Sequence, residues 1–456
     1  MAARSVPELR FELDVDAPSP ALTSSAVGID KVAHRTPDAE QRVVTVFDTG
    51  DERLLRAGIV VAHRITAGVG EWYFSAPGWA PRLPAEQVEP LSLSVDIPET
   101  FLAMIRPITR GASLAPVAAL ERSTREYVLR SKDGSQLCII ADEEVLVRRH
   151  ATIVERFRQV LVLPGPDLTL QQYAHVADAV RAVGGVQVDE FRTLQQRLGA
   201  PATGLTDFPV PQPLRRTATM EELVSAVFAA DLRALTVLLL DAGRDKRSHV
   251  APLNAQLESV RRDLRGLAHV LEPSWREQVE SLLSGVPFAH VSDATDVALD
   301  VVEALVCEVR APKLGDVASD EAAPLLMERA QQAAAIMADR CGALSVGSPD
   351  HEWEAALGAA EMLAISAAVA EPVLGKPLRR IARRLQAITE HLRMCGGDWR
   401  MTDSELDQLT PLEAFALGAR VERGRAQTQS ERTRFVALWP DRLDELRRLL
   451  SKAKKS

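Results

Sequence analysis

Apolar segments bounded by turn residues follow one another through the first 163 positions of the chain. Residues 42–47 are rich in β-branched side chains and end at an Asp-Thr-Gly-Asp turn, which is typical of a strand. Asp133 and Gly134 lie between two more apolar segments and predict a β-hairpin. In all, the pattern predicts strands over 42–47, 58–66, 71–76, 126–132, 136–141, 144–149 and 156–163. Strands at this density predict an antiparallel sheet that is closed or nearly closed.

The apolar period lengthens to that of a helix after position 167. A helix is expected over 167–183, where Gly184 and Gly185 provide a stop. Beyond Thr217, apolar residues recur at i, i+3 and i+4 almost to the C-terminus. This spacing predicts helices over 220–240, 250–270, 274–283, 297–309, 321–340, 353–370 and 378–392, with one or two more over 411–449. An all-α bundle is the simplest arrangement of these helices.

The two patterns are separated by residues 199–213, which contain four prolines and two glycines. Proline fixes φ and removes an amide donor, so this segment is expected to be a linker. The sequence therefore predicts an α+β protein of two domains. The expected limits are 1–200 for the strand-rich domain, 201–216 for the linker, 217–452 for the helical domain and 453–456 for a basic tail.

Charge and cysteine content exclude several classes of protein. The formal net charge is −9, which argues against the basic surface of a general nucleic-acid binder. The four cysteines are widely spaced and form no Cys-x-x-Cys pair, so neither a disulfide framework nor a zinc site is expected. No apolar run approaches 18 residues, and charges near the N-terminus interrupt any signal-peptide core. We expect a cytoplasmic protein that makes no use of a membrane.

Residues 46–64, VFDTGDERLLRAGIVVAHR, resemble the hallmark segment of CYTH domains, also called triphosphate tunnel metalloenzymes. The matching positions there are Asp48, Thr49, Asp51, Arg53, Leu54, Arg56, Ala57 and Gly58. Weaker matches at Trp72, 116–120, 139–145 and 196–199 extend the resemblance over about residues 1–200. It implies an antiparallel tunnel of eight strands. It also implies that Lys and Arg side chains inside the tunnel bind a triphosphate, while carboxylates hold a divalent metal.

The chain departs from the family at most of the positions that bind ligand. Four positions that carry carboxylates in the family hold other residues here: Val6, Ile139, Gln159 and Leu161. Two family cations are replaced by Ala62 and Ser75. A metal with few oxygen ligands binds weakly, so the resemblance implies a tunnel that has lost most of its metal site.

The residues that remain define the candidate site. The carboxylates expected to serve in catalysis and to hold any metal are Glu8, Asp142 and Glu144. The cations expected to bind phosphate in this domain are Arg10, Arg64, Arg122, Arg125 and Arg158.

The helical half resembles a CHAD domain, an all-α bundle associated with polyphosphate binding, and residues 414–443 are similar to its closing helix. The first basic signature falls on 254–265, where Glu258 and Asp263 stand at arginine positions although Gln256 is retained. The second falls on 351–362 and has become acidic. A basic cluster remains at 376–384, including Arg379 and Arg383, which is either a solvated helix face or a displaced anion site.

Three functions follow from these features. The favoured one is a non-catalytic binding or scaffold protein with weak affinity for a phosphorylated ligand. The second is a metal-dependent hydrolase of inorganic or nucleoside triphosphate, and the third is polyphosphate binding by the bundle. No cofactor is expected for the first or the third function, whereas the triphosphate hydrolase would need Mg²⁺ or Mn²⁺. The expected partner is a phosphate-chain ligand or another protein, with no specific nucleic acid, and the oligomeric state stays open.

Overall fold

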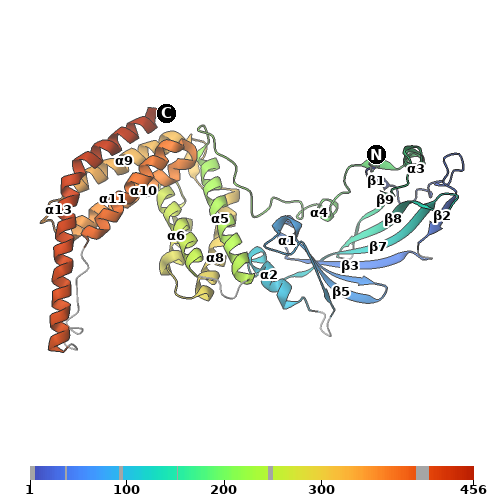
Figure 1. Cartoon of the computed structure of the whole chain (residues 1–456), viewed down its shortest axis with the longest axis horizontal. Helices are drawn as coiled ribbons and strands as arrows, with labels where there is room; N and C mark the ends of the chain where they lie inside the picture. Colours follow the sequence, from blue (N-terminus) through green and yellow to red (C-terminus); the bar gives the residue numbers. More distant parts are fainter. Residues whose placement is uncertain are drawn as a thin grey trace. The chain divides into compact units, whose positions relative to one another are not determined.

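The structure is a computed structural model that describes residues 6–35, 38–91, 96–150, 152–244, 250–396 and 410–455 (Figure 1). The chain divides into two compact units. The strand-rich unit comprises residues 1–209 and 239–248, and the helical unit comprises 210–238 and 249–456. Positions 1–5 and 456, which the expected domain limits include, lie outside the described residues.

The strand-rich unit is built on one antiparallel sheet of ten strands. Its strands are β1 (Leu9–Leu13), β2 (Lys31–His34), β3 (Glu40–Asp48), β4 (Val60–Thr66), β5 (Val69–Ser75), β6 (Glu86–Pro90), β7 (Ala115–Arg130), β8 (Gln136–Arg149), β9 (Thr152–Pro164) and β10 (Val186–Val188). They lie in the order β10-β1-β9-β8-β7-β3-β4-β5-β6, and β2 pairs with β7. The antiparallel sheet followed by helices confirms the prediction.

The sheet differs from the expected tunnel because it has ten strands and is not closed. Its two edges explain this difference. The β6 edge carries Glu86, Glu89 and Pro90, and a proline cannot donate to a further strand. The β10 edge is only three residues long. Strands β1, β2, β6 and β10 were not among those that the apolar pattern predicts, whereas the two predicted strands over 136–141 and 144–149 form one continuous strand, β8.

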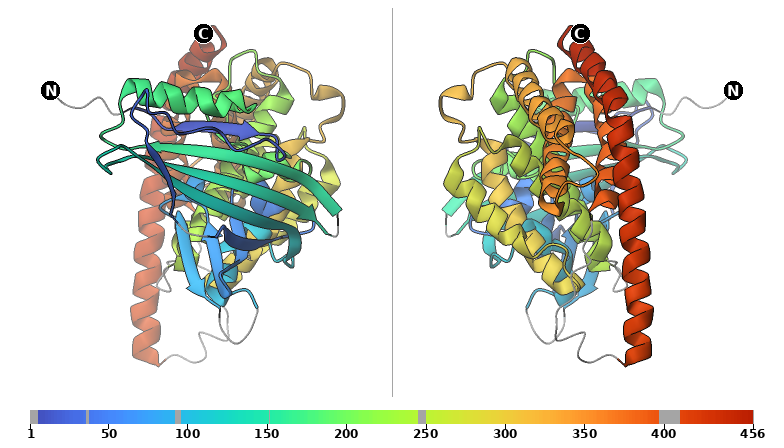
Figure 2. Two further views of the ribbon diagram at one scale, coloured as in Figure 1. Left: turned by 90° about the vertical axis from the view of Figure 1, so that its right-hand side faces the viewer. Right: turned by 90° about the vertical axis from the view of Figure 1, so that its left-hand side faces the viewer.

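The longer helices α2 (Glu99–Thr109) and α3 (Leu170–Ala182) cover one face of the sheet, which we call the helix face. In contrast, Leu55 of the short helix α1 (Arg53–Arg56) and Leu198 of the short helix α4 (Leu194–Leu198) pack on the opposite face. Helix α3 packs its Val176 and Val180 on Phe11 of β1 and Val160 of β9. Figure 2 shows α3 running beside these strands. Helix α2 packs elsewhere on the same face, where Phe101 meets Phe74 of β5 with ring centroids 5.4 Å apart. Successive side chains of a strand point to opposite faces of the sheet. The residues next to those that contact α2 and α3 therefore point to the other face.

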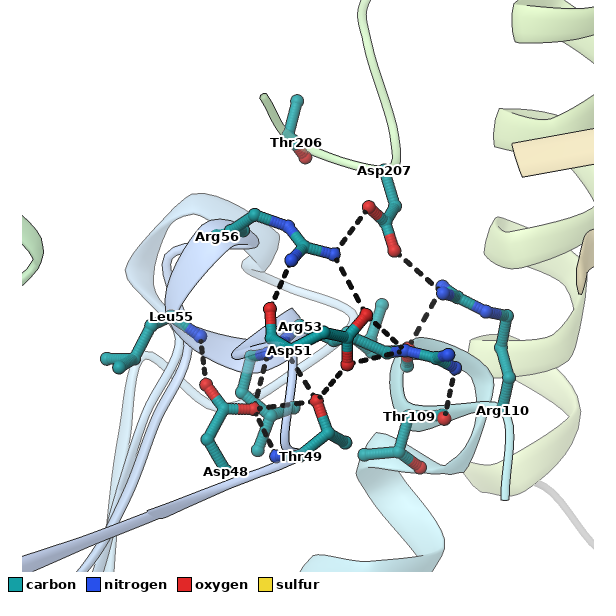
Figure 3. A network of polar contacts seen from close by, with 12 residues as sticks. Asp48, Thr49, Asp51, Arg53, Leu55, Arg56, Thr109, Arg110, Thr206 and Asp207 are labelled. Carbon is teal, nitrogen blue, oxygen red and sulfur yellow. Dashed lines mark hydrogen bonds and ion pairs between the residues drawn. The ribbon is translucent and has the colours of Figure 1, made fainter. Parts of the chain in front are cut away.

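The segment that resembles CYTH domains makes a tight turn into the short helix α1 (Arg53–Arg56). The Asp48 carboxylate accepts hydrogen bonds from the backbone amides of Thr49, Leu54 and Leu55 at 2.7, 2.9 and 2.8 Å (Figure 3). It thereby satisfies amides that a helix N-terminus leaves without partners. Burial raises the pKa of Asp48 to about 6 even though these amides act in the other direction. Asp48 therefore serves to hold the backbone.

A buried ion-pair network joins α1, α2 and the proline-rich segment (Figure 3). Asp207 accepts hydrogen bonds from Arg56 at 2.9 Å and from Arg110 at 2.7 Å. The three side chains are at most 7% exposed. Burial alone would raise the pKa of Asp207, but Arg110 and Arg56 outweigh it and lower that pKa. Asp207, which lies in the segment expected to be a linker, is thus anchored within the strand-rich unit.

The helical unit contains α5 (Met220–Arg244), α6 (Val250–Leu267), α7 (Pro273–Leu282), α8 (Val291–Arg310), α9 (Ala322–Gly342), α10 (Asp350–Leu374), α11 (Lys376–Cys395) and α13 (Pro411–Lys455). Helices α6 and α10 cross closely at Gly266. A Cβ atom added there would lie only 2.5 Å from the side chain of Val369. Figure 2 shows α13 running along neighbouring helices of this unit, and Phe435 of α13 contacts Trp353 of α10. The predicted helices are all present, most of them longer than predicted.

Two helices satisfy the length and composition of a membrane span, although charged residues interrupt the apolar run in each. They are Met220–Gly243 and Asp350–Leu374, with mean hydropathies of 2.0 and 1.5. About half of each apolar stretch is buried within the protein, at 56% and 44%. Core helices of soluble proteins pass the same test, so these two helices are weak support for a membrane location.

We predict that Asp207→Ala destabilises the strand-rich unit by about 3–5 kcal/mol, because it removes the buried carboxylate that Arg56 and Arg110 share and leaves Arg56 only its longer contact with Asp51, at 3.4 Å. Hydrogen exchange of the peptide 48–58, followed through a urea titration, reports this unit separately from the helical one. The folded-state pKa of Asp207 is lowered, so its contribution is present above about pH 4 and is lost as the pH falls further.

Asp178→Ala is the matched control, because Asp178 is 74% exposed in its pair with Arg181. It should change stability by less than about 0.5 kcal/mol. Equal effects of the two substitutions would contradict the role of Asp207.

Candidate functional site

The face of the sheet opposite the helix face carries a row of arginines, and we call it the arginine face. The strand registers place Arg10 of β1, Arg122 of β7, Arg42 of β3 and Arg64 of β4 on it. Three of the predicted phosphate-binding residues therefore share one face. This is the surface on which the resemblance to CYTH domains would place a triphosphate.

Each of these arginines is paired with a carboxylate of its own strand or a neighbouring one. The pairs are Arg10–Glu8 at 2.7 Å, Arg42–Glu40 at 3.1 Å, Arg64–Glu71 at 2.6 Å and Arg122–Glu143 at 3.4 Å. Arg64 also stacks on the ring of Tyr73 at 3.8 Å. Burial raises the pKa of Tyr73, so its hydroxyl stays neutral beside this arginine.

The short helix α4 (Leu194–Leu198) and the residues before it add two more arginines to this face. The Arg197 side chain is 3% exposed and lies over the ring of Phe157, with the guanidinium carbon 3.4 Å from the ring centroid. It also pairs with Glu12 at 2.6 Å and with Glu155 at 3.1 Å. Arg192 pairs with Glu155 at 2.8 Å. The resemblance suggested a basic residue near position 192, but the buried Arg197 was missed.

Six arginines are thus matched by six carboxylates on the arginine face. An anion approaching a face of balanced charge gains little from the long-range field. Several of the pairs are solvent-exposed, with Arg10 and Glu8 at 35% and 46%, and such pairs contribute only about 0–1 kcal/mol each. The pairing therefore removes net attraction for phosphate, although individual pairs can open.

Other predicted site residues lie on the opposite face. The register sets Asp142 opposite Arg125, and Glu144 opposite Arg158, all on the helix face. Asp142 receives two hydrogen bonds from Arg158, at 2.8 and 2.7 Å, and both side chains are buried. This contact raises the pKa of Arg158. Arg158 also donates to the backbone oxygen of Ala17 at 2.6 Å, so the pair holds the N-terminal loop in place.

The structure therefore separates the three predicted catalytic carboxylates. Glu8 lies beside Arg10 on the arginine face, whereas Asp142 and Glu144 point away from it. Glu143 is the carboxylate of β8 that does reach the arginine face, where Gln159 donates to it at 2.6 Å. Within the described residues, no three His, Cys, Asp or Glu side chains converge as they would around a metal ion.

The basic cluster of the helical unit lies on α11. Arg379 pairs with Glu371 at 2.5 Å, and Arg384 pairs with Glu445 of α13 at 2.8 Å. Arg383 is exposed on the same helix. Glu361 belongs to residues 351–362, the second signature that has become acidic. It pairs with Arg393 at 2.8 Å. These contacts are those of a solvated helix surface laced with ion pairs.

No family model and no curated protein matches the chain. Solved structures match its N-terminal part. A Bacillus halodurans protein, provisionally described as an adenylate cyclase, is 12% identical over 37% of this chain and 96% of its own, with a TM-score of 0.23. A Pyrococcus horikoshii protein is 11% identical over 42% and 95%, with a TM-score of 0.23. A Hippeastrum protein, provisionally described as an adenylyl cyclase with a dominant triphosphatase activity, is 12% identical over 41% and 91%, with a TM-score of 0.21. TM-scores this low carry no argument about activity.

The pairing on the arginine face predicts that Glu143→Gln strengthens binding of tripolyphosphate by roughly 3- to 10-fold at low ionic strength, because it releases Arg122 from its carboxylate. Titration calorimetry at two salt concentrations measures the change.

Glu144→Gln is the matched control, since it makes the same substitution one residue along on the helix face. It should leave the affinity within about twofold of the wild type, as expected for a screened charge on the far side of the sheet. An equal gain from both substitutions would show that only net charge matters and would overturn the face assignment.

Proposed function

We propose that the strand-rich unit is a CYTH-like domain that binds ligands without hydrolysing them, and that the whole chain acts as a binding or scaffold protein. Its affinity for a phosphate chain is weak. The observation that carries this proposal is the pairing of each of the six arginines on the arginine face with a carboxylate.

Electrostatics explains why this arrangement suits weak binding. A triphosphate carries several negative charges, and tight sites surround it with cations in excess. Here a phosphate oxygen must displace a carboxylate such as Glu71, which lies 2.6 Å from Arg64. The displaced carboxylate then repels the ligand unless a cation joins it. Binding should therefore be weak and should decline as salt is added.

Metal-dependent hydrolysis of a triphosphate is the alternative. It is favoured by one observation, which is that Glu8, Glu12 and Glu143 share a face with the arginines. Carboxylates and arginines on one surface are the groups that Mg²⁺ or Mn²⁺ and a phosphate chain would use. Against it, Asp142 and Glu144 lie on the helix face, and Ile139 and Leu161 occupy arginine-face positions with apolar side chains.

Polyphosphate binding by a CHAD-like helical unit is supported by the exposed arginines Arg380 and Arg383 of α11. The pairing of Arg379 and Arg384 with carboxylates weakens that support.

A cytoplasmic location is also part of the proposal. All four cysteines are free thiols, which is the state that a reducing compartment maintains.

The test measures phosphate release from tripolyphosphate by the full chain with Mg²⁺ and then with Mn²⁺. We expect the wild type and Glu8→Ala to release phosphate at the same background rate. The reason is that, within the described residues, no three His, Cys, Asp or Glu side chains converge around Glu8 as they would around a metal ion.

Glu144→Ala serves as the control for general charge effects, because its side chain is on the helix face. Turnover that Glu8→Ala abolishes and Glu144→Ala preserves would replace the binding proposal with the triphosphatase alternative.

A further inference from the structure

Two carboxylates from neighbouring helices meet at a pocket inside the helical unit. Asp231 lies on α5 and Asp263 on α6. Asp231 is only 5% exposed, and its Oδ1 accepts a hydrogen bond from Gln256 at 2.8 Å. Its Oδ2 is buried without a hydrogen-bond donor. The Asp263 carboxyl can donate to Asp231 only while it carries a proton, so in the ionised pair this buried oxygen has no donor, which is costly.

The pocket beside these carboxylates has the size and lining of a small-molecule site. Its volume is about 580 Å³, within the range usual for ligand pockets. Apolar side chains such as Val227 and Val369 line it together with the proline-rich stretch 211–214, and Asp231 and Asp263 form its acidic end. The close crossing of α6 and α10 at Gly266 holds two of its walls together. An apolar chamber with a few convergent polar groups is the usual form of a ligand site.

The charge of the pocket is negative and is not compensated by a contacting cation. Neither carboxylate takes part in an ion pair with a described residue, and the nearest influence is the exposed Arg262. Burial raises the pKa of Asp231, and the neighbouring charge of Asp263 raises it further. Two carboxylates in one site resist ionising together, so the unoccupied pair retains a proton that a cation can replace.

We propose that this pocket binds a small organic ammonium compound, with its nitrogen held between Asp231 and Asp263 and its apolar body against the walls of α5 and α10. An ammonium group supplies the N–H donors that Asp231 Oδ2 lacks. Its aliphatic or aromatic body matches the alanine, valine and proline side chains around it. A hydrated metal ion would gain nothing from those walls, and an anion would be repelled. The inference concerns the helical unit and does not rest on the function proposed for the strand-rich unit.

The test uses the full chain and titrates it with phenethylammonium chloride in a calorimeter. Phenethyl alcohol is the neutral analogue, 3-phenylpropionate the anionic one, and MgCl₂ the metal control. We expect saturable binding of the ammonium compound with release of protons to the buffer. We expect at least tenfold weaker binding of the alcohol, and no binding of the other two.

The variants Asp231→Asn and Asp263→Asn keep the shape of each side chain while removing its charge. Each should weaken ammonium binding at least tenfold. Neither should lower Tm, because the like-charge repulsion is relieved. Glu258→Gln is the matched control on α6, since Glu258 pairs outside the pocket with Arg261, and it should leave binding within twofold of the wild type. Equal binding of the alcohol, binding of Mg²⁺ instead, or ammonium binding that survives both asparagine variants would overturn the proposal.

Discussion

The two-residue period of a β-strand decides which charges of this protein can meet. Glu143 and Glu144 are adjacent in sequence but face opposite sides of the sheet, as do Arg158 and Gln159. A slip of one residue would exchange both sets. It would also expose the buried Val145 and Val160, which lie on opposite faces of adjacent strands. Apolar packing on both faces therefore fixes the register, and the register places the arginines and their carboxylates together.

The residues that carry the resemblance to CYTH domains mainly hold the backbone. Asp48 binds three amides at the start of α1, and Arg56 reaches across to Asp207. Arg53 donates to the backbone oxygen of Thr109 at the end of α2, at 2.9 Å. These contacts join a strand end, two helices and the proline-rich segment. A motif with this role indicates how the chain folds in that region, and it leaves the chemistry of the arginine face undetermined.

Much of the fold could be predicted from apolar periodicity, because long strands and helices each bury a regular stripe. Strands β3 and β9 and the helices beyond Thr217 were predicted in this way. Short elements such as α1, α4 and β10 offer too few positions for a period. Helix α2 was also missed, and it contains Pro107, which usually ends a helix.

The candidate site was harder to predict than the fold. A motif alignment gave Asp142 and Glu144 as ligands, but only the observed register shows that Glu143 occupies the arginine face. Arg197 was missed because its partners Glu12 and Glu155 lie on distant strands. The contact between Asp231 and Asp263 likewise joins two helices. Each residue taken alone reads as an ordinary polar position on an amphipathic helix.

The net charge of −9 describes the whole chain and does not show how charge is arranged in each unit. The pairing of neighbouring charges differs between the two units. On the arginine face the opposite charges cancel in pairs, at a surface where water already solvates many of them. At Asp231 and Asp263 two acidic groups meet, with Asp231 buried and Asp263 half-buried, and the resemblance to CHAD domains would place an arginine at position 263. Packing gains nothing from such a pair, because an apolar side chain of the same size would fill the space without the cost of desolvation. A bound cation offsets that cost, so the buried acidic pair is better explained by a ligand than by the stability of the bundle.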